Sequence, residues 1–599
     1  MKTGDYVRPW NNDLRIICLL ETEHALPYSP IVNSATSPAT PGAAFAGFRG
    51  AILGVSVISG IINVLALTGS LYMLQVYDRV LSSHSVPTLI ALSFLMIVLY
   101  AFHGTLDMLR SQASSHAAAL FDRRMARPVH FAVLNLPLQG ASRSLAQQPM
   151  RDVDAIRHFL ANGGPVAFLD LPWMPVYLAF VFVLHPLLGL VCLAGMLMLV
   201  MLTLLTEWLT QKDALAATRA DAARRGIADT QARSAEVLKA MGLEDRAAQR
   251  FDAANRSYLA VQTRSSQLIA RLTSVSRFMR LTLQSGMLGL GAYLTVRGEI
   301  TSGAIIAASI TTSRALAPIE QVIAHWRPFL AARQSLRRLS ETLRNLPLLD
   351  PPFALPAPTQ RLSLENATLC APGTQCLVLS NISFELRAGQ ALAIIGPSAA
   401  GKSSLARAIC GVWPLKQGCI RLDGAEINHW SSKQLGQHIG YLPQDVTLFD
   451  GTIADNIGRM EDEKDSMAII AAAKAAGIHD MILRLPNGYE TDVGPDGSAL
   501  SAGQRQRLAL ARALFRDPFL VVLDEPNSNL DSDGEESLTT AIQGIRDRHG
   551  IAVVVAHRSS ALNAVDLVAV INAGQLTAFG PKEDVLRKVL RQPLRTAVG

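Results

Sequence analysis

Six long apolar stretches between residues 51 and 325 constrain the fold of this chain more than any other feature. Each is close to the roughly 20 residues that an α-helix needs to cross a bilayer, although the fifth is short and the sixth carries Arg314. The sequence therefore predicts six membrane spans, near residues 51–77, 87–107, 165–184, 187–206, 281–297 and 303–323. The alternative, a set of buried helices in a soluble core, does not explain the regular charge pattern between the stretches.

That charge pattern predicts the orientation of the spans. The links after the first, third and fifth stretches, 78–86, 185–186 and 297–301, are short and nearly uncharged. The links after the second and fourth are long and rich in arginine: Arg110, Arg123, Arg124, Arg127, Arg219, Arg224, Arg225 and Arg233. By the positive-inside rule, the long links and both termini are cytoplasmic. Their helical composition predicts that the membrane helices continue into the cytoplasm, where segments 151–160 and 242–251 are candidates for contact with the C-terminal domain.

Composition agrees with a membrane protein, because 49% of the residues are hydrophobic and only 17% are charged. The net charge of +7 comes from the N-terminal part, since the chain beyond residue 360 is slightly acidic. This distribution argues against a nucleic-acid partner and favours anionic lipid headgroups. The six cysteines have no regular spacing, so we expect free thiols in a reducing compartment and no metal cluster built on them.

Several polar residues fall within or beside the predicted spans. Charges inside a membrane are costly and usually face a cavity or a partner, whereas a side chain near the end of a span can reach the interface. Both interpretations stay open for Asp78, Arg79, His103, Asp107, Asp170 and Arg314.

Composition also predicts the domain boundaries. Residues 1–48 are low in complexity and are expected to be a disordered tail. A proline-rich segment at 341–360 is expected to link a membrane domain at 49–340 to a second domain at 361–599.

Residues 396–404, GPSAAGKSS, are typical of a phosphate cradle. They follow an apolar strand-like run at 391–395 and precede a helix-like stretch at 405–410. In such a turn, glycines let backbone N–H groups face a phosphate, and the helix N-terminus adds partial positive charge. Lys402 would reach the β- and γ-phosphates, and Ser403 would ligate Mg²⁺.

Two buried strands downstream end in residues suited to phosphate chemistry. The apolar run 519–523 ends in Asp524 and Glu525, which could hold Mg²⁺ and activate a water molecule, respectively. The run 551–555 is followed by His557. A lone histidine is usually structural, but its place at the end of a strand in a phosphate-binding sheet favours a functional role.

Together these motifs resemble those of ABC transporters. The segment Leu500-Ser501-Ala502-Gly503-Gln504 is similar to the family signature, Gln444 matches the Q-loop, Ser528 to Asp531 the D-loop, and His557 the switch histidine. The resemblance implies a six-span α-helical exporter domain followed by an α/β P-loop ATPase domain that uses ATP and Mg²⁺. It implies catalytic roles for Lys402, Gln444, Glu525 and His557, and metal ligands Ser403, Gln444 and Asp524. The implied nucleotide-binding residues are Gly396, Pro397, Ser398, Ala399, Ala400, Gly401, Lys402, Ser403, Ser404, Ser501, Gly503, Gln504 and Asp531.

The membrane half narrows the resemblance. Segments 72–92 and 170–189 are similar to the permease/ATPase subunit of type I secretion systems, in the branch that exports proteases, lipases and calcium-binding repeat proteins. This implies a homodimer in the bacterial inner membrane, with a cytoplasmic ATPase domain, a periplasmic adaptor, an outer-membrane channel and a secreted protein substrate. Relatives with a peptidase domain carry it before the first span. Here Cys18 and His24 lie too close together in the tail to serve as nucleophile and base, so we expect an uncleaved C-terminal signal on the cargo.

Three departures from the family pattern stand out. Ala502 replaces a glycine of the signature, Ala371 stands where many relatives carry an adenine-stacking tyrosine, and Asn529 replaces an alanine of the D-loop.

The alternative functions are an exporter of lipids, drugs or small peptides, a soluble ABC ATPase that acts on DNA or ribosomes, and a catalytically silent regulator. The predicted spans disfavour the second, and the intact Lys402, Asp524, Glu525 and His557 disfavour the third.

Overall fold

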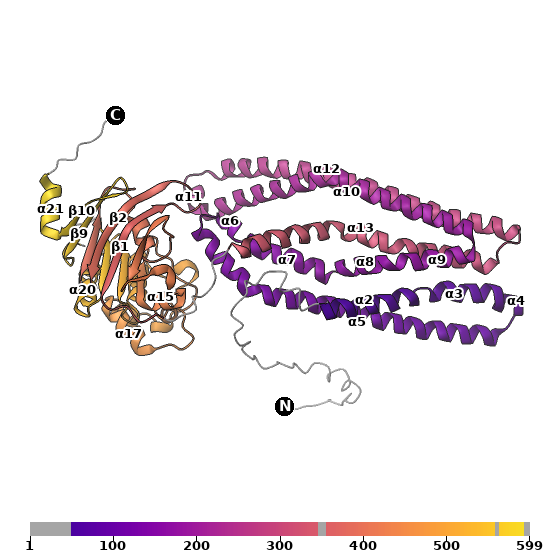
Figure 1. Ribbon diagram of the computed structural model, residues 1–599, viewed down its shortest axis with the longest axis horizontal. Helices are drawn as coiled ribbons and strands as arrows, with labels where there is room; N and C mark the ends of the chain where they lie inside the picture. The colour runs from indigo at the N-terminus through magenta and orange to yellow at the C-terminus, as the bar shows by residue number, and fades with distance from the viewer. Residues whose placement is uncertain (1–48, 346–354, 557–561, 592–599) are drawn as a thin grey trace, which may run out of the picture.

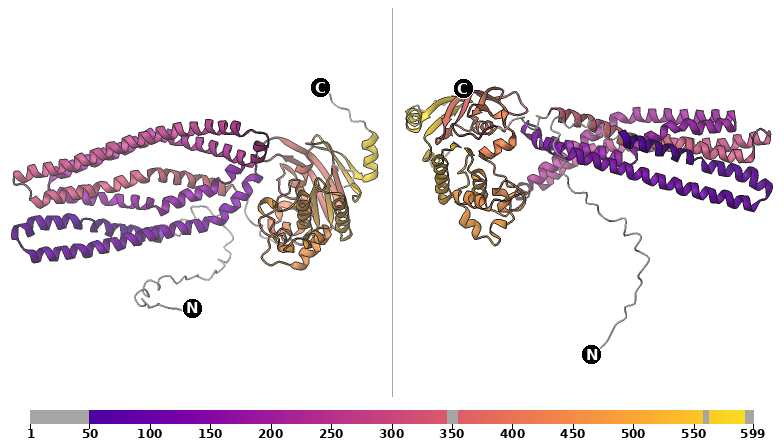
Figure 2. Two further views of the ribbon diagram at one scale, coloured as in Figure 1. Left: turned by 180° about the vertical axis from the view of Figure 1, so that it is seen from behind. Right: turned by 60° about the horizontal axis from the view of Figure 1, so that its bottom comes forward.

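The computed structural model describes residues 49–345, 355–556 and 562–591. A long bundle of helices leads at one end into an α/β domain, and the views of Figures 1 and 2 agree on this arrangement. The expected tail at 1–48, much of the expected linker and His557 lie outside the described residues.

The bundle consists of long helices that run back and forth along its axis. In chain order they are α2 (Arg49–Leu65), α3 (Thr68–Gln75), the π-helical turn η1 (Val76–Val80), α4 (Leu81–Ser83), α5 (Val86–Leu138), α6 (Arg143–Ala146), α7 (Gln148–Ala161), α8 (Gly164–Asp170), η2 (Leu171–Trp173), α9 (Met174–Leu184), α10 (Pro186–Arg233), α11 (Ala235–Ala240), α12 (Glu244–Val296) and α13 (Ser302–Arg344). The predicted continuation of the membrane helices is confirmed, because α5, α10, α12 and α13 run on toward the α/β domain (Figure 1).

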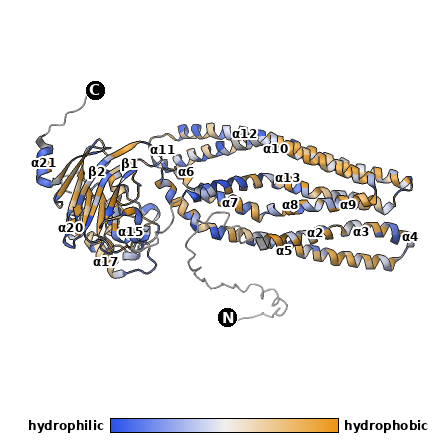
Figure 3. Cartoon of the chain, in the orientation of Figure 1, coloured by the Kyte–Doolittle hydropathy of each residue, from blue (hydrophilic) through white to orange (hydrophobic). Residues whose placement is uncertain are grey.

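Four segments of the described chain are long and apolar enough to cross a bilayer: Ile52–Ser83, Val86–Leu138, Gly164–Leu184 and Pro186–Thr210. The fifth and sixth predicted spans form parts of α12 and α13, which are more polar than these four. The structure explains why α13 can be more polar than these four segments. Its neighbours bury one small or polar residue after another, including Ala304, Ala307 and Thr311, so little of this helix needs an apolar surface. Figure 3 shows the hydrophobic band at the end of the bundle away from the α/β domain.

The helical part extends further than predicted. Because Leu339 and Leu343 are buried in a cluster with Phe121 and Met125 of α5, α13 stays helical to Arg344. It therefore includes the first residues of the segment 341–360 that composition assigned to the linker.

Two of the polar residues singled out in the spans stabilise the bundle. Asp170 accepts hydrogen bonds from Asn63 Nδ2 at 2.8 Å and from Arg110 Nη1 at 3.2 Å, which joins α8 to α2 and α5. Tyr177 donates to the side-chain oxygen of Asn63 at 2.8 Å. A charge in a membrane domain thus has partners on neighbouring helices, which favours a structural role for Asp170.

Asp78 connects the link after the first span, 78–86, with the link after the fifth span, 297–301, and with the start of α13. In chain order, the second of these three short links is 185–186 and the third is 297–301. Its carboxylate accepts from Thr301 Oγ1 at 2.6 Å and from the backbone N–H of Gly303 at 2.9 Å, at the N-terminus of α13. His185 Nε2 lies 3.2 Å from Glu299 Oε2, so the second link also contacts the third. Arg314, by contrast, is exposed in the middle of its span in the single chain. Unlike Asp170 and Asp78, it is therefore still a candidate for lining a polar path.

Two sheets form the α/β domain. A six-stranded sheet has the order β10-β9-β3-β8-β7-β6, in which only β10 runs antiparallel to its neighbour, and a four-stranded antiparallel sheet has the order β2-β1-β4-β5. The strands are β1 (Arg361–Cys370), β2 (Leu377–Arg387), β3 (Ala391–Ile395), β4 (Gln417–Leu422), β5 (Ala425–Glu426), β6 (Ile439–Leu442), β7 (Leu520–Asp524), β8 (Ile551–Val555), β9 (Leu567–Asn572) and β10 (Gln575–Pro581). The helices are α14 (Lys402–Ile409), α15 (Ser432–His438), α16 (Ile453–Ile457), α17 (Ser466–Ala475), α18 (His479–Leu483), α19 (Ala502–Leu514), α20 (Ser532–Asp547) and α21 (Lys582–Arg591).

The buried pair in the bundle generates a prediction. In Asp170→Asn, the guanidinium of Arg110 keeps, among the described residues, only the exposed Asp107 as a carboxylate partner, so we expect a loss of about 3 kcal/mol of stability. Asp154→Asn is the matched control, because Asp154 pairs with Arg157 on the surface and the change should cost less than about 1 kcal/mol. Thermal unfolding of the purified transporter in detergent measures both. Equal melting temperatures for the two variants would contradict a stabilising role for Asp170.

Candidate functional site

The candidate site lies where four neighbouring parallel strands end. In the order β3-β8-β7-β6, the phosphate cradle follows β3, His557 follows β8, Glu525 follows β7, and Gln444 follows β6. Because parallel strands have their carboxyl ends at the same edge of a sheet, this topology brings together residues more than a hundred positions apart. His557 itself lies outside the described residues.

The cradle has the backbone geometry that its glycines predict. Gly396 has φ +152°, and a Cβ there would lie 2.0 Å from the carbonyl oxygen of Ile571, so only glycine fits. Gly401 has φ +97° and directly precedes α14. Pro397, Ser398 and Ala399 between them are exposed, so the loop is accessible to a ligand.

Lys402 is held over this loop. Its Nζ donates to the carbonyl oxygens of Gly396 at 3.0 Å and Pro397 at 2.8 Å, and the side chain is buried. Burial lowers the pKa of Lys402, while the nearby Glu525 and Asp524 oppose the shift. A desolvated ammonium group in a loop of turned backbone is suited to a phosphate ligand.

Ser403 and Asp524 meet at the junction of α14 and β7. Ser403 Oγ donates to Asp524 Oδ1 at 3.0 Å, whereas Asp524 Oδ2 is buried and has no hydrogen-bond partner in the described chain. Burial raises the pKa of Asp524, and the hydrogen bond from Ser403 opposes the shift. A buried carboxylate oxygen without a partner, next to a hydroxyl, fits a hard divalent cation such as Mg²⁺.

Two further residues of the predicted site are Glu525, directly after Asp524, and Gln444, after the neighbouring strand β6. Glu525 has a left-handed backbone with φ +53°, and its N–H donates to the carbonyl oxygen of Val555 at 3.2 Å. Such a conformation costs energy for a residue other than glycine and is common at functional sites. Gln444 is exposed in the loop after β6.

The signature segment is well formed, but its main contacts in the described chain are with elements other than the cradle. Ser501 caps α19: it accepts from the N–H of Gln504 at 3.3 Å, and Gln504 Oε1 accepts from the N–H of Ser501 at 2.8 Å. Ala502 sits in the first turn of α19 and has no positive φ, so alanine replaces glycine there without strain. A Cβ at Gly503 would lie 3.0 Å from the carbonyl oxygen of Asn529. Helix α19 packs against α16, α17 and β6, whereas α14 packs against β7 and β8.

Gln506 is a residue that the sequence did not single out. It is buried on α19, donates to the carbonyl oxygen of Pro526 and accepts from the N–H of Asn529 at 3.0 Å. At the next position, Arg507 Nη2 donates to Asp531 Oδ1 at 2.7 Å, while Asp531 also caps α20. These bonds fix the D-loop to the signature helix. The available signal in the sequence was the position of Gln506, two residues before Leu508, where the buried apolar part of α19 begins.

The expected base-binding loop contacts the membrane domain. Ala371 is followed by Pro372 and Gly373, and a Cβ at Gly140, just after α5, would lie 2.5 Å from the carbonyl carbon of Pro372. Segment 151–160 was expected to contact the C-terminal domain, but its main described contacts lie within the bundle. This segment belongs to α7, which packs between α5 and α13, and Asp152 is buried there with Arg338 Nη2 at 2.6 Å. No described contact places segment 242–251 on the domain either.

Comparison with known families and proteins agrees with this geometry. The family described as "ABC transporter" matches residues 379–528, and "ABC transporter transmembrane region" matches residues 51–315. The type I secretion system ATP-binding protein PrsD of Rhizobium meliloti (strain 1021) is 50% identical over 92% of this chain and 95% of its own. The cyclolysin secretion/processing ATP-binding protein CyaB of Bordetella pertussis (strain Tohama I) is 28% identical over 89% of this chain and 75% of its own.

A solved structure of a bacterial Atm1-family ABC exporter with ATP bound has the same fold. It superposes with a TM-score of 0.77 at 25% identity and covers 91% of this chain and 97% of its own.

The contact at Gly140 generates a prediction. In Gly140→Ala, the new methyl group must displace the Pro372–Gly373 backbone next to Ala371, so we expect the KM for ATP to rise about three- to tenfold. Gly163→Ala is the control, because Gly163 has φ +77° but no atom within 4 Å of an added Cβ. Gly163→Ala therefore introduces the same kind of backbone strain as Gly140→Ala, but without a steric clash. An unchanged KM in Gly140→Ala would contradict a link between this contact and nucleotide binding.

Proposed function

The chain belongs to the ABC transporter family, among its type I secretion ATP-binding proteins, and on that basis we propose that it exports an unfolded protein whose C-terminal signal is not cleaved. It is an inner-membrane protein with a cytoplasmic ATPase domain, in which ATP hydrolysis is coupled to transport. The observation that carries the proposal is the identity of half the residues with a type I secretion protein over nearly the whole chain.

We assign the chemistry of hydrolysis to the edge of the six-stranded sheet. The cradle and Lys402 hold the phosphates of ATP, and Glu525 orients the attacking water and accepts its proton. Ser403, Asp524 and Gln444 would hold Mg²⁺, which when bound neutralises charge between the β- and γ-phosphates. His557 follows the strand between these groups and completes the catalytic set.

Completion of each site requires a second chain in this proposal. Ser501 and Ala502 are exposed, and α19 packs toward β6 rather than toward α14. In a head-to-tail homodimer, Ser501, Gly503 and Gln504 of one chain would face the γ-phosphate held by the cradle of the other, and Asp531 would fix the D-loop beside them. ATP binding would then close the two ATPase domains and shift the membrane helices between two arrangements.

The proposed cargo route follows from the same family membership. A periplasmic adaptor and an outer-membrane channel would continue the path beyond the inner membrane, so that the substrate crosses both membranes in one step. The relative named for the secretion of cyclolysin supports a protein cargo rather than a lipid, drug or small peptide.

A mixing experiment tests the homodimer. Lys402→Ala and Ser501→Arg are each expected to abolish turnover, but in a mixed dimer both lesions fall on one composite site and leave the other intact. Random pairing should therefore recover about one quarter of wild-type ATPase activity. Mixing Lys402→Ala with Glu525→Gln is the matched control, because each site of that mixed dimer keeps one lesion and stays inactive. Recovery in both mixtures, or in neither when mixed dimers have formed, would argue against the head-to-tail arrangement.

A secretion experiment tests the cargo. Glu525→Gln should lower ATP turnover by about 10²- to 10⁴-fold and remove from the medium a protein that wild-type cells secrete. Glu536→Gln, the same chemical change at an exposed position of α20, should leave secretion intact. Intact-mass measurement should show the encoded C-terminus on the secreted protein, and deletion of that segment should abolish export. An N-terminal leader removed in a transporter-dependent way would refute the proposed signal.

A further inference from the structure

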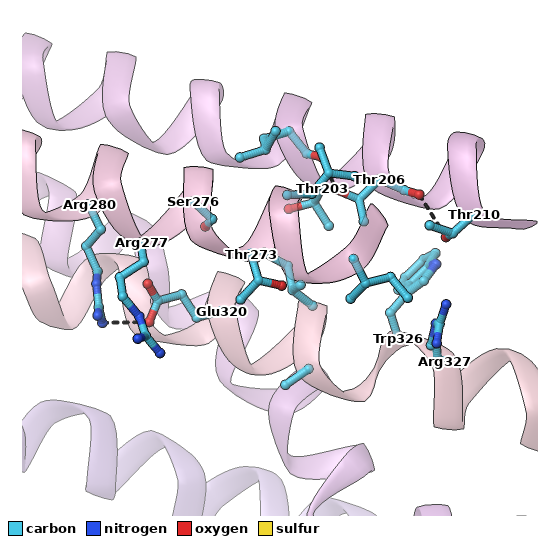
Figure 4. A pocket seen from close by; sticks show the side chains of 15 residues that line it. Thr203, Thr206, Thr210, Thr273, Ser276, Arg277, Arg280, Glu320, Trp326 and Arg327 are labelled. Atoms are coloured by element: carbon cyan, nitrogen blue, oxygen red, sulfur yellow. Dashed lines mark hydrogen bonds and ion pairs between the residues drawn. The ribbon is translucent and has the colours of Figure 1, made fainter. Parts of the chain in front are cut away.

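Polar side chains outside the predicted motifs make well-defined contacts at two places. The first is a cavity of about 340 Å³ between α10, α12 and α13 (Figure 4). At one end of it, Arg280 Nη1 donates to Glu320 Oε2 at 3.0 Å, which joins α12 to α13. The second is the side chain of Gln506 on α19, whose partners belong to the loop that carries the proposed catalytic base.

Gln506 binds the backbone on both sides of this base. Its side chain is only 2% exposed. Nε2 donates to the carbonyl oxygen of Glu525 at 3.3 Å and to that of Pro526, and Oε1 accepts from the N–H of Asn529 at 3.0 Å. A side-chain amide has two donor hydrogens and one acceptor oxygen, so both of its functions serve the same segment, 525–529. The amide therefore fixes this segment to the signature helix.

The backbone of Glu525 benefits from such support because its conformation is unusual. Its φ of +53° lies in the left-handed region, which costs energy for a residue other than glycine. Its N–H donates to the carbonyl oxygen of Val555 at 3.2 Å, and its own carbonyl accepts from Ser528 as well as from Gln506. These bonds hold the peptide groups on both sides of the Glu525 Cα, and thereby the direction of its side chain. A displacement of about 1 Å at a reacting group can cost up to about 10²-fold in rate.

The same helix presents its N-terminus to the other nucleotide in the proposed homodimer. Gln506 follows Ser501, the N-cap of α19, by five residues, which is about 7.5 Å along the helix axis. Gly503 between them packs closely on the same loop, because a Cβ there would lie 3.0 Å from the carbonyl oxygen of Asn529. The tip of α19 would thus contact the nucleotide of the partner, while its side holds the base of its own chain.

We propose that Gln506 is a positioning residue for ATP hydrolysis, and that it acts at the cradle of its own chain by holding Glu525 rather than at the site that its helix faces. The proposal rests on the catalytic base and the head-to-tail homodimer proposed above. It has a consequence for the dimer: when the partner's ATP draws in the tip of α19, the movement reaches Glu525 through this amide. Each nucleotide would then influence the base at the other site.

Mixed dimers with a single working site test where Gln506 acts. When Ser501→Arg and Lys402→Ala chains pair, the working site has the cradle and Glu525 of the Ser501→Arg chain and the signature of the Lys402→Ala chain. Gln506→Met keeps the length of the side chain but removes the donor. On the Ser501→Arg chain it should lower the recovered kcat about 10- to 100-fold, with the KM for ATP unchanged within about twofold. On the Lys402→Ala chain it should retain the recovered rate.

Asn456→Leu on the Ser501→Arg chain is the matched control. Asn456 is another fully buried amide of the same domain, and its side chain accepts from the N–H of Phe449 and donates to the carbonyl oxygen of Phe449, both at 2.9 Å. Its loss also frees a loop, but that loop contains no residue of the proposed site. The recovered kcat should therefore stay within about twofold of the parent mixture. Melting temperatures of the purified chains establish that they are folded.

Several outcomes would overturn the proposal. Equal loss with Gln506→Met on either chain would assign Gln506 to the general stability of α19, and loss only on the Lys402→Ala chain would assign it to the signature. An unchanged kcat in both arrangements would leave it no part in hydrolysis. If Gln506→Met chains do not fold, Gln506→Glu takes their place with the same expectations, because a carboxylate still accepts from Asn529 but cannot donate to Glu525. A parent mixture without activity, although mixed dimers have formed, would instead refute the homodimer on which the proposal rests.

Discussion

The hydrogen bond between Ser403 and Asp524 depends on the order of the strands that carry them. Residues 403 and 524 are far apart in the chain, but β3 and β7 are separated in the sheet only by β8. Since all three run parallel, their carboxyl ends lie at one edge, and the cradle, the buried carboxylate and the backbone of Glu525 meet there. The same order leaves Asp524 Oδ2 buried without a partner among the described residues, which is costly unless a cation is bound. The order and direction of the strands therefore bring the residues of the ATPase site together, and the side chains then supply its chemistry.

The membrane half obeys a different constraint, because its polar groups must find partners inside the bundle. Asp170 binds Arg110 and Asn63, and Asp78 binds the start of α13. Helix α13 lies among its neighbours and carries small residues where they approach closely. These contacts join helices that are far apart in the sequence.

The motifs of the ATPase domain could be predicted from sequence because each is local: a cradle, a strand end or a helix cap fits within a few residues. The contact of Gly140 with Pro372 could not, since neither residue carries a pattern and the contact joins two domains. The packing of segment 151–160 could not be predicted for a related reason, because the partner of Asp152 is Arg338, nearly two hundred residues away. Helix α13 can be polar because neighbouring helices bury it. Those neighbours are distant in the sequence, so a local stretch of sequence does not reveal them.

Helix α5 connects the two halves and shows how they influence each other. Its 53 residues span about 80 Å, and its C-terminal end lies at the contact between Gly140 and Pro372. Arg110, near the middle of the helix, is tied to Asp170. If a stiff helix is held at its middle, a displacement of one end moves the other end in the opposite direction. Two proline residues, Pro128 and Pro137, lie in the half between this tie and the ATPase domain, where bending would absorb part of the movement. The burial of Phe121, Met125 and Val129 in a cluster shared with α7 and α13 counteracts such bending, because this half of α5 is then held by both helices.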